Sequence, residues 1–189
     1  MKYSIAASLI LLISSTALAA PPTEKGWYAG GVVGVTNADD DKLFESPGVS
    51  FDDTDVSYGL FAGYKFLKYL GLEARFTQLG RYSISTTNSG SDKIKPTALS
   101  ANLIGSLPLG QSSWELFGQL GVAQVLVNTD LPEVDDQTAG TAGVGIRVYP
   151  KENVAFTLQY DVYLWEEEIG NEKYDIEIGT TQVGLLFHF

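Results

Sequence analysis

The stretch NVAFTLQYDVYLW, residues 153–165, alternates apolar and polar side chains at every second position. One face of an extended chain carries Val154, Phe156, Leu158, Tyr160, Val162 and Leu164, and the other carries Ala155, Thr157, Gln159, Asp161 and Tyr163. Because successive side chains of a β-strand point to opposite sides, this period of two predicts a strand with two chemically different faces.

The same alternation recurs along the chain and predicts eight strands. They cover about residues 26–36, 54–66, 68–80, 95–107, 113–128, 138–150, 153–165 and 177–189. The links FLK, PLGQS and PKEN are short, whereas the links after the first, third, fifth and seventh strands are long. Each strand reaches the roughly nine to eleven residues that cross a membrane. The predicted fold class is therefore all-β, an eight-stranded antiparallel up-and-down transmembrane β-barrel.

The first twenty residues are predicted to be a signal peptide. Lys2 precedes an apolar stretch around residues 5–13, and small residues including Ala19 and Ala20 stand directly before Pro21. This order is typical of a secretory signal with cleavage near Ala19 or Ala20. We therefore expect residues 21–189 to form one exported barrel domain, and no later stretch reaches eighteen consecutive apolar residues.

Composition excludes several classes of function. The chain has no cysteine, so neither a disulfide framework nor a thiolate nucleophile is available. The net charge of −11 argues against a nucleic-acid partner, because phosphate backbones are bound through clustered Lys and Arg.

The acidic excess lies in the first, third and fourth long connections, which hold 15 of the 23 acidic residues. Two interpretations stay open: a solvated, repelling surface, or a surface for divalent cations or a basic ligand. The run DDDKLFESPG that starts at Asp39 lacks the glycine and the closing glutamate of a calcium loop, so we expect no specific metal site and no cofactor.

The second face of the strands is small and polar, and it carries six ionisable side chains. Three are basic and three are acidic: Lys65, Glu73, Arg75, Glu115, Arg147 and Asp161. A narrow interior tolerates charges only when they are paired, so this balance predicts an interior ion network, with Glu115 and Arg147 as its first pair. Lipid would then contact the apolar face; the alternative is a secreted soluble barrel with an apolar interior.

Aromatic residues near both ends of the strands support the membrane alternative, because interfacial aromatic girdles flank such barrels. The predicted girdle at the short-turn end consists of Trp27, Tyr69, Trp114, Tyr149 and Phe187. The predicted girdle at the long-loop end consists of Tyr58, Phe76, Tyr82, Tyr160 and Trp165.

The signal peptide, the opening GWYAGGVVGV, the eight amphipathic strands and the terminal FHF together resemble the small outer-membrane barrels related to the membrane domain of OmpA and to the OmpX and Ail group. The resemblance implies that interior ion pairs plug the lumen. It also implies that Val183, Leu185, Phe187 and Phe189 form a C-terminal signal for the barrel-assembly machinery. Because the chain stops at the barrel, we do not expect the peptidoglycan binding of full-length OmpA.

The expected function is that of a non-enzymatic component of the outer membrane, in contact with lipid and lipopolysaccharide, with long acidic loops for adhesion or another surface interaction. The one histidine, His188, is expected at the periplasmic rim, away from any Ser/His/acid arrangement. The alternatives are a small or gated pore, a lipid A-modifying enzyme and a soluble ligand-binding barrel. The sequence does not identify the surface ligand.

Overall fold

The computed structural model describes residues 19–22, 24–39, 54–80, 82–86, 89–110, 112–128, 137–169 and 172–189. Most of the predicted signal peptide therefore lies outside the described residues, as do large parts of the first and third long connections. The described residues contain no helix that is long and apolar enough to cross a membrane.

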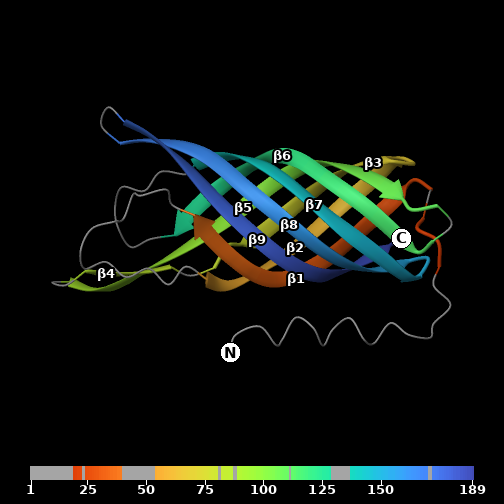
Figure 1. Ribbon diagram of the computed structural model, residues 1–189, viewed down its shortest axis with the longest axis horizontal. Coiled ribbons are helices and arrows are strands. Elements are labelled where there is room, and N and C mark those ends of the chain that lie inside the picture. Colours follow the sequence, from red (N-terminus) through yellow and green to blue (C-terminus); the bar gives the residue numbers. More distant parts are fainter. Residues whose placement is uncertain are drawn as a thin grey trace.

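Nine antiparallel strands make up the described fold (Figure 1). They are β1 (Gly26–Asp39), β2 (Thr54–Leu67), β3 (Leu70–Gln78), β4 (Tyr82–Thr86), β5 (Ser89–Pro108), β6 (Trp114–Asn128), β7 (Gln137–Lys151), β8 (Val154–Ile169) and β9 (Glu172–His188). Consecutive strands pair with each other except β3 and β4; β3 pairs with β5 instead, and β1 pairs with β9. Since β4 pairs with β5 alone, eight strands close the barrel, as predicted.

Two connections that the sequence predicted as loops are β-hairpins. Strand β4 pairs with the start of β5, from Tyr82 opposite Ile94 to Thr86 opposite Ser89. Strands β8 and β9 stay paired as far as Ile169 and Glu172, through most of the stretch EEEIGNEKYDI. The prediction ended these strands too early because it followed the apolar face, and backbone pairing continues where both faces are polar.

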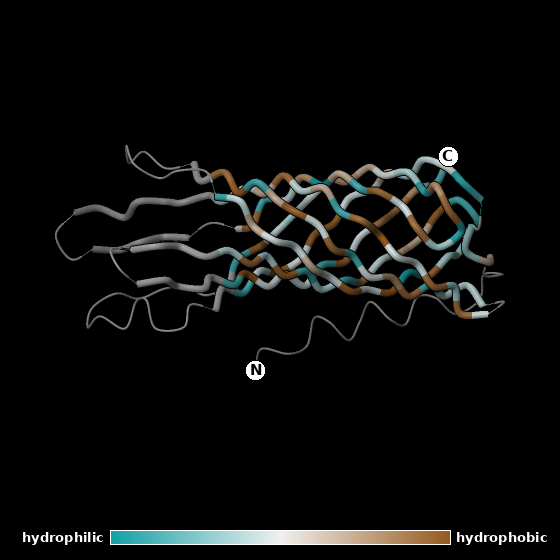
Figure 2. Tube along the Cα trace, turned by 90° about the horizontal axis from the view of Figure 1, so that it is seen from above, coloured by the Kyte–Doolittle hydropathy of each residue, from teal (hydrophilic) through white to brown (hydrophobic). Residues whose placement is uncertain are grey.

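Burial divides the two faces of the strands as predicted. On the outer face, Leu60, Leu120 and Val144 are 69%, 68% and 64% exposed. On the inner face, ionisable side chains such as Arg75 and Glu115 are almost completely buried. Figure 2 shows the resulting alternation of hydrophobic and hydrophilic positions along the barrel wall. An apolar exterior around a polar interior suits lipid, so the structure agrees with the predicted membrane barrel and not with the alternative of a soluble barrel with an apolar interior.

The predicted girdles need two corrections. Tyr149 is completely buried, and Trp165 is partly buried against an apolar cluster inside the barrel. Tyr149 has the same parity as inward Arg147, and Trp165 has the same parity as inward Asp161, so both rings face the interior. The exposed members are Trp27, Tyr69, Trp114, Phe187, Tyr58, Phe76 and Tyr160. The side chain of Tyr82 lies outside the described part.

Candidate functional site: the barrel interior

The first feature of the interior is an ion cluster near the short-turn end. Glu115 on β6 and Arg147 on β7 are direct register partners, and Arg147 Nη1 donates to Glu115 Oε1 at 3.0 Å. From β2, Lys65 Nζ lies 3.5 Å from Glu115 Oε2. Glu115 and Arg147, which the sequence indicated as the first ion pair, are therefore in contact. Lys65 joins them from a strand that is adjacent to neither β6 nor β7.

Aromatic side chains enclose this lower cluster, which consists of Lys65, Glu115 and Arg147. The guanidinium carbon of Arg147 lies 4.0 Å from the centroid of the Phe117 ring. The Tyr149 hydroxyl donates to Glu115 Oε1 at 3.4 Å and lies 3.5 Å from His188 Nε2. Cation–π contact and hydrogen bonding together replace part of the water that these groups lose on burial.

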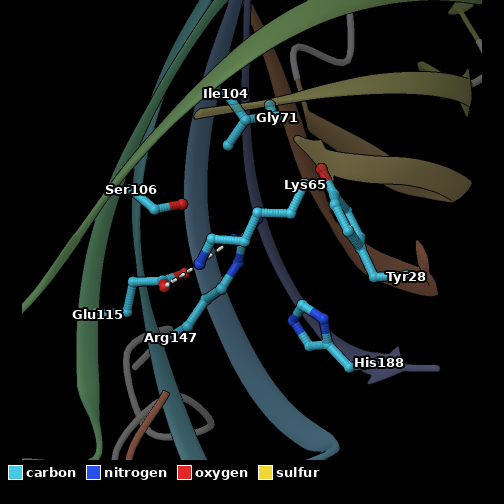
Figure 3. Close-up of a pocket in the computed structure, with 8 residues that line it drawn as sticks. All are labelled: Tyr28, Lys65, Gly71, Ile104, Ser106, Glu115, Arg147 and His188. Atoms are coloured by element: carbon cyan, nitrogen blue, oxygen red, sulfur yellow. Dashed lines mark hydrogen bonds and ion pairs between the residues drawn. The ribbon is translucent and has the colours of Figure 1, made fainter. Parts of the chain in front are cut away.

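Beside the lower cluster lies a cavity of about 10 Å³ (Figure 3). Lys65, Glu115 and Arg147 line it together with Tyr28, Gly71, Ile104, Ser106 and His188. A single water molecule needs about 10–15 Å³ of such space. The lower part of the lumen is therefore filled almost entirely by side chains.

A second ion cluster lies further along the lumen and consists of Glu73, Arg75 and Asp161. Arg75 donates to Glu73 Oε1 through Nε at 3.0 Å and Nη2 at 2.6 Å, and to Asp161 Oδ2 through Nη1 at 2.8 Å. Asp161 also accepts hydrogen bonds of 2.5 Å from the Gln119 and Gln159 side-chain amides. All three ionised groups are buried and multiply hydrogen-bonded, as buried charges in proteins must be.

The central cluster, which consists of Glu73, Arg75 and Asp161, connects opposite sides of the barrel. Strand β3, which carries Arg75, and strand β8, which carries Asp161, are four strands apart in either direction around the closed sheet. They are therefore diametrically opposite, and the 2.8 Å ion pair crosses the lumen.

Toward the long-loop end the interior becomes apolar, which the sequence analysis missed. The buried cluster there consists of Leu79, Ala98, Ala123, Val125, Ala139, Tyr163 and Ile178. The Tyr163 hydroxyl lies 3.4 Å from Thr77 Oγ1 and so turns its polar end toward the central cluster. The signal was present, because Val125 and Ile178 share the parity of inward residues on their strands.

The glycines of the inner face leave room for these large side chains. A Cβ atom on Gly63 would overlap the ring of Tyr28, and one on Gly143 would overlap the carboxylate of Asp161. An eight-stranded barrel is only just wide enough for side chains to fill, so each large residue needs a small one opposite it.

The C-terminal residues complete the short-turn end. Val183, Leu185 and Phe187 face outward on β9, and Phe189 is 82% exposed, with its backbone N–H bonded to the Trp27 carbonyl at 2.9 Å. His188 faces inward and is partly buried between the rings of Tyr28 and Tyr149.

No set of three or more His, Asp or Glu side chains in the described ranges is arranged to hold a metal ion. Most acidic residues of the long connections fall outside those ranges or on residues whose side chains are not described. The described carboxylates of the interior form ion pairs with Arg and Lys side chains instead.

The closed antiparallel barrel, its apolar outer wall and its ion-paired interior define a transmembrane β-barrel of the outer-membrane class. The chain belongs to the family described as outer membrane protein beta-barrel domain, whose model matches residues 5–189.

Two curated relatives are both named outer membrane protein A. The one from Yersinia pseudotuberculosis is 30% identical over 122 residues, which are 64% of this chain and 33% of that protein. The one from Salmonella typhi is 27% identical over 180 residues, 90% of this chain and 49% of that protein. The chain thus spans between a third and a half of the length of these relatives.

Solved barrels share the fold at lower identity. Neisserial surface protein A has a TM-score of 0.63 and 18% identity, with 88% of this chain and 99% of that chain covered. The outer membrane protein OprG from Pseudomonas aeruginosa has a TM-score of 0.59 and 15% identity, with 93% and 99% covered. Ail, the attachment invasion locus protein of Yersinia pestis, has a TM-score of 0.53 and 15% identity, with 88% and 100% covered.

Proposed function

We propose that the protein is a non-enzymatic, integral component of the outer membrane whose lumen is sealed and whose interactions take place at the cell surface. The observation that carries this proposal is the ion pair between Arg75 and Asp161, which joins opposite walls of the barrel. On this account, residues 1–20 are removed on export, and the barrel-assembly machinery reads the strand that ends at Phe189.

Three successive layers support a sealed lumen. The lower cluster fills the short-turn end and leaves room for about one water molecule. The central cluster crosses the middle, and the apolar cluster around Leu79 and Val125 follows toward the long-loop end. A hydrated ion that entered would have to displace two sets of paired charges and then cross an apolar layer, which is costly at every step.

The interior also supports a non-enzymatic role. A hydrolase of the Ser/His/acid type needs a histidine within hydrogen-bond reach of a hydroxyl nucleophile and a carboxylate. The one histidine of the chain, His188, lies between two tyrosine rings at the short-turn end, and the hydroxyl beside its Nε2 is the phenol of Tyr149, not a serine. An unchanged lipid A mass spectrum on overexpression is expected, and a new lipid A species would overturn this part of the proposal.

A surface role is favoured because the hairpin of β8 and β9 continues beyond the amphipathic part of the barrel into the acidic stretch EEEIGNEK. We propose that this hairpin end of the barrel binds a basic ligand, because the chain carries a net charge of −11. Cells expressing E166Q/E167Q/E168Q should bind polylysine-coated beads less well than cells with the unaltered chain. Equal binding at low salt would contradict this assignment.

Planar-bilayer recordings test the sealed lumen directly. The purified, folded protein is expected to give no large, long-lived open channels, and a variant of an exposed lysine, Lys151→Gln, is the matched control. The double variant R75A/D161A removes the cross-lumen pair and is expected to increase ion flux. Large and stable conductance in the unaltered protein would refute the proposal and favour a pore.

A further inference from the structure

The lipid-facing wall is not smooth at the short-turn end. A shallow, open hollow lies on the outside of β5 and β6, bordered by Tyr69, Leu107 and Leu116. Its floor is formed by Gly105 and Gly118, which are direct register partners.

The two glycines on the floor face lipid and are not required by the barrel. They share the parity of exposed Leu107 and Leu116. A Cβ atom on Gly105 would have no neighbour nearer than 4.0 Å, and one on Gly118 none nearer than 3.8 Å. Neither has a positive φ angle. Unlike inward Gly63, they open space on the outside of the wall.

An exposed cation, Lys68, lies beside Tyr69 at one edge of this apolar hollow. Lys68 lies in the turn between β2 and β3, and its Nζ is 5.0 Å from the centroid of the Tyr69 ring. The Tyr69 carbonyl accepts a 2.8 Å hydrogen bond from the Ser106 N–H, which holds the turn against β5. Among the described carboxylates, none is within ion-pair distance of Lys68.

We propose that this hollow and Lys68 together bind one anionic glycerophospholipid, with an acyl chain along Gly105 and Gly118 and the phosphate at the Lys68 ammonium. The apolar floor matches the chain, and the exposed cation matches the headgroup, as at other basic sites beside apolar membrane surfaces. Tyr69 supplies an amphipathic ring at the level where the headgroup meets the chain. The proposal rests on the membrane placement of the barrel and is independent of whether the lumen conducts.

Native mass spectrometry of the full barrel released from detergent micelles tests this site. The measured quantity is the fraction of protein that carries one lipid as phosphatidylglycerol or phosphatidylethanolamine is titrated. The double variant G105L/G118L fills the hollow and should lose the bound lipid. Lys68→Gln should weaken phosphatidylglycerol binding about fivefold, the usual effect of one lysine near a lipid surface, and should weaken the binding of zwitterionic phosphatidylethanolamine less.

Gly140→Leu is the matched control for volume. Gly140 is exposed on β7, and a Cβ atom there would have no neighbour nearer than 3.8 Å, but it does not border the hollow. It should bind lipid like the unaltered protein. Heat-modifiable gel mobility reports whether each variant is folded, and Lys68→Gln, in a turn, tests the site even if the double variant does not fold.

Three results would overturn the proposal. Unchanged lipid binding in folded G105L/G118L would show that the hollow is not the site. An equal effect of Lys68→Gln on both lipids would show that no anionic headgroup is recognised there. A protein dimer that disappears on filling the hollow would identify a second copy of the chain as its occupant.

Discussion

Removing the charge of Arg75 is the most informative single change in the interior. Arg75→Met keeps the length of the side chain but leaves the carboxylates of Glu73 and Asp161 buried without their common cation. Both carboxylates are at most 2% exposed, so water cannot replace the guanidinium without opening the lumen.

The expected cost follows from this geometry. Breaking a buried ion pair by removing one partner costs about 3–5 kcal/mol, because an uncompensated charge is left behind. With a slope near 2 kcal/mol per molar of urea, a loss of about 4 kcal/mol lowers the unfolding midpoint by about 2 M. The triple variant E73Q/R75M/D161N removes all three charges together and should recover most of that loss, since neutral replacements of buried ion clusters are often tolerated.

Urea unfolding of the protein refolded into lipid vesicles measures these differences, followed by heat-modifiable gel mobility. Lys151→Met removes an exposed cation and should change the free energy of unfolding by less than about 1 kcal/mol. If Arg75→Met were no more destabilising than this control, the central cluster would be in contact with water, and the sealed lumen would be refuted.

Three further predictions concern the wall and the end of the chain. Leu120→Arg should destabilise the inserted barrel by about 2–4 kcal/mol in the same assay, because Leu120 is 68% exposed on the lipid side; no change would place it in water. Gly63→Leu should lower the free energy of unfolding by about 1–3 kcal/mol or more, because the new side chain would overlap Tyr28. Gly140→Leu should lower it by less than about 0.5 kcal/mol, and similar values for the two variants would contradict the faces assigned to these glycines. Deletion of Phe189 should reduce insertion in cells more than folding in detergent, and equal losses would indicate a packing role.

The alternation of side chains predicted the closed fold, and the six ionisable residues that it placed on the second face are all buried. A strand between lipid and a packed lumen has a different solvent on each side, so residues such as Leu158 and Gln159 cannot exchange faces. The difference between the two sides of a strand is largest within the membrane, and it disappears where both sides face water. For that reason the last four residues of β8 and the first five of β9 were predicted as a loop although their backbones are paired.

Two kinds of interior feature could not be predicted from the alternation: the inward position of two aromatic rings, and a contact between opposite strands. Tyr149 and Trp165 had the parity of the interior, but their position near strand ends favoured an interfacial role, and the buried cluster that receives Trp165 is seen only when all strands are in register. Arg75 and Asp161 are 86 residues apart in the chain. Their contact depends on the stagger of opposite strands around the closed barrel, which no local pattern encodes.

We expect the chain to be integrated in the outer membrane as a barrel, with its apolar wall toward lipid and its paired charges inside. Fractionation of expressing cells, combined with gel mobility before and after heating, tests it most directly. We expect recovery in the detergent-extractable outer-membrane fraction and a mobility that changes on heating. Recovery in the aqueous periplasmic fraction, without a heat-dependent change in mobility, would contradict it.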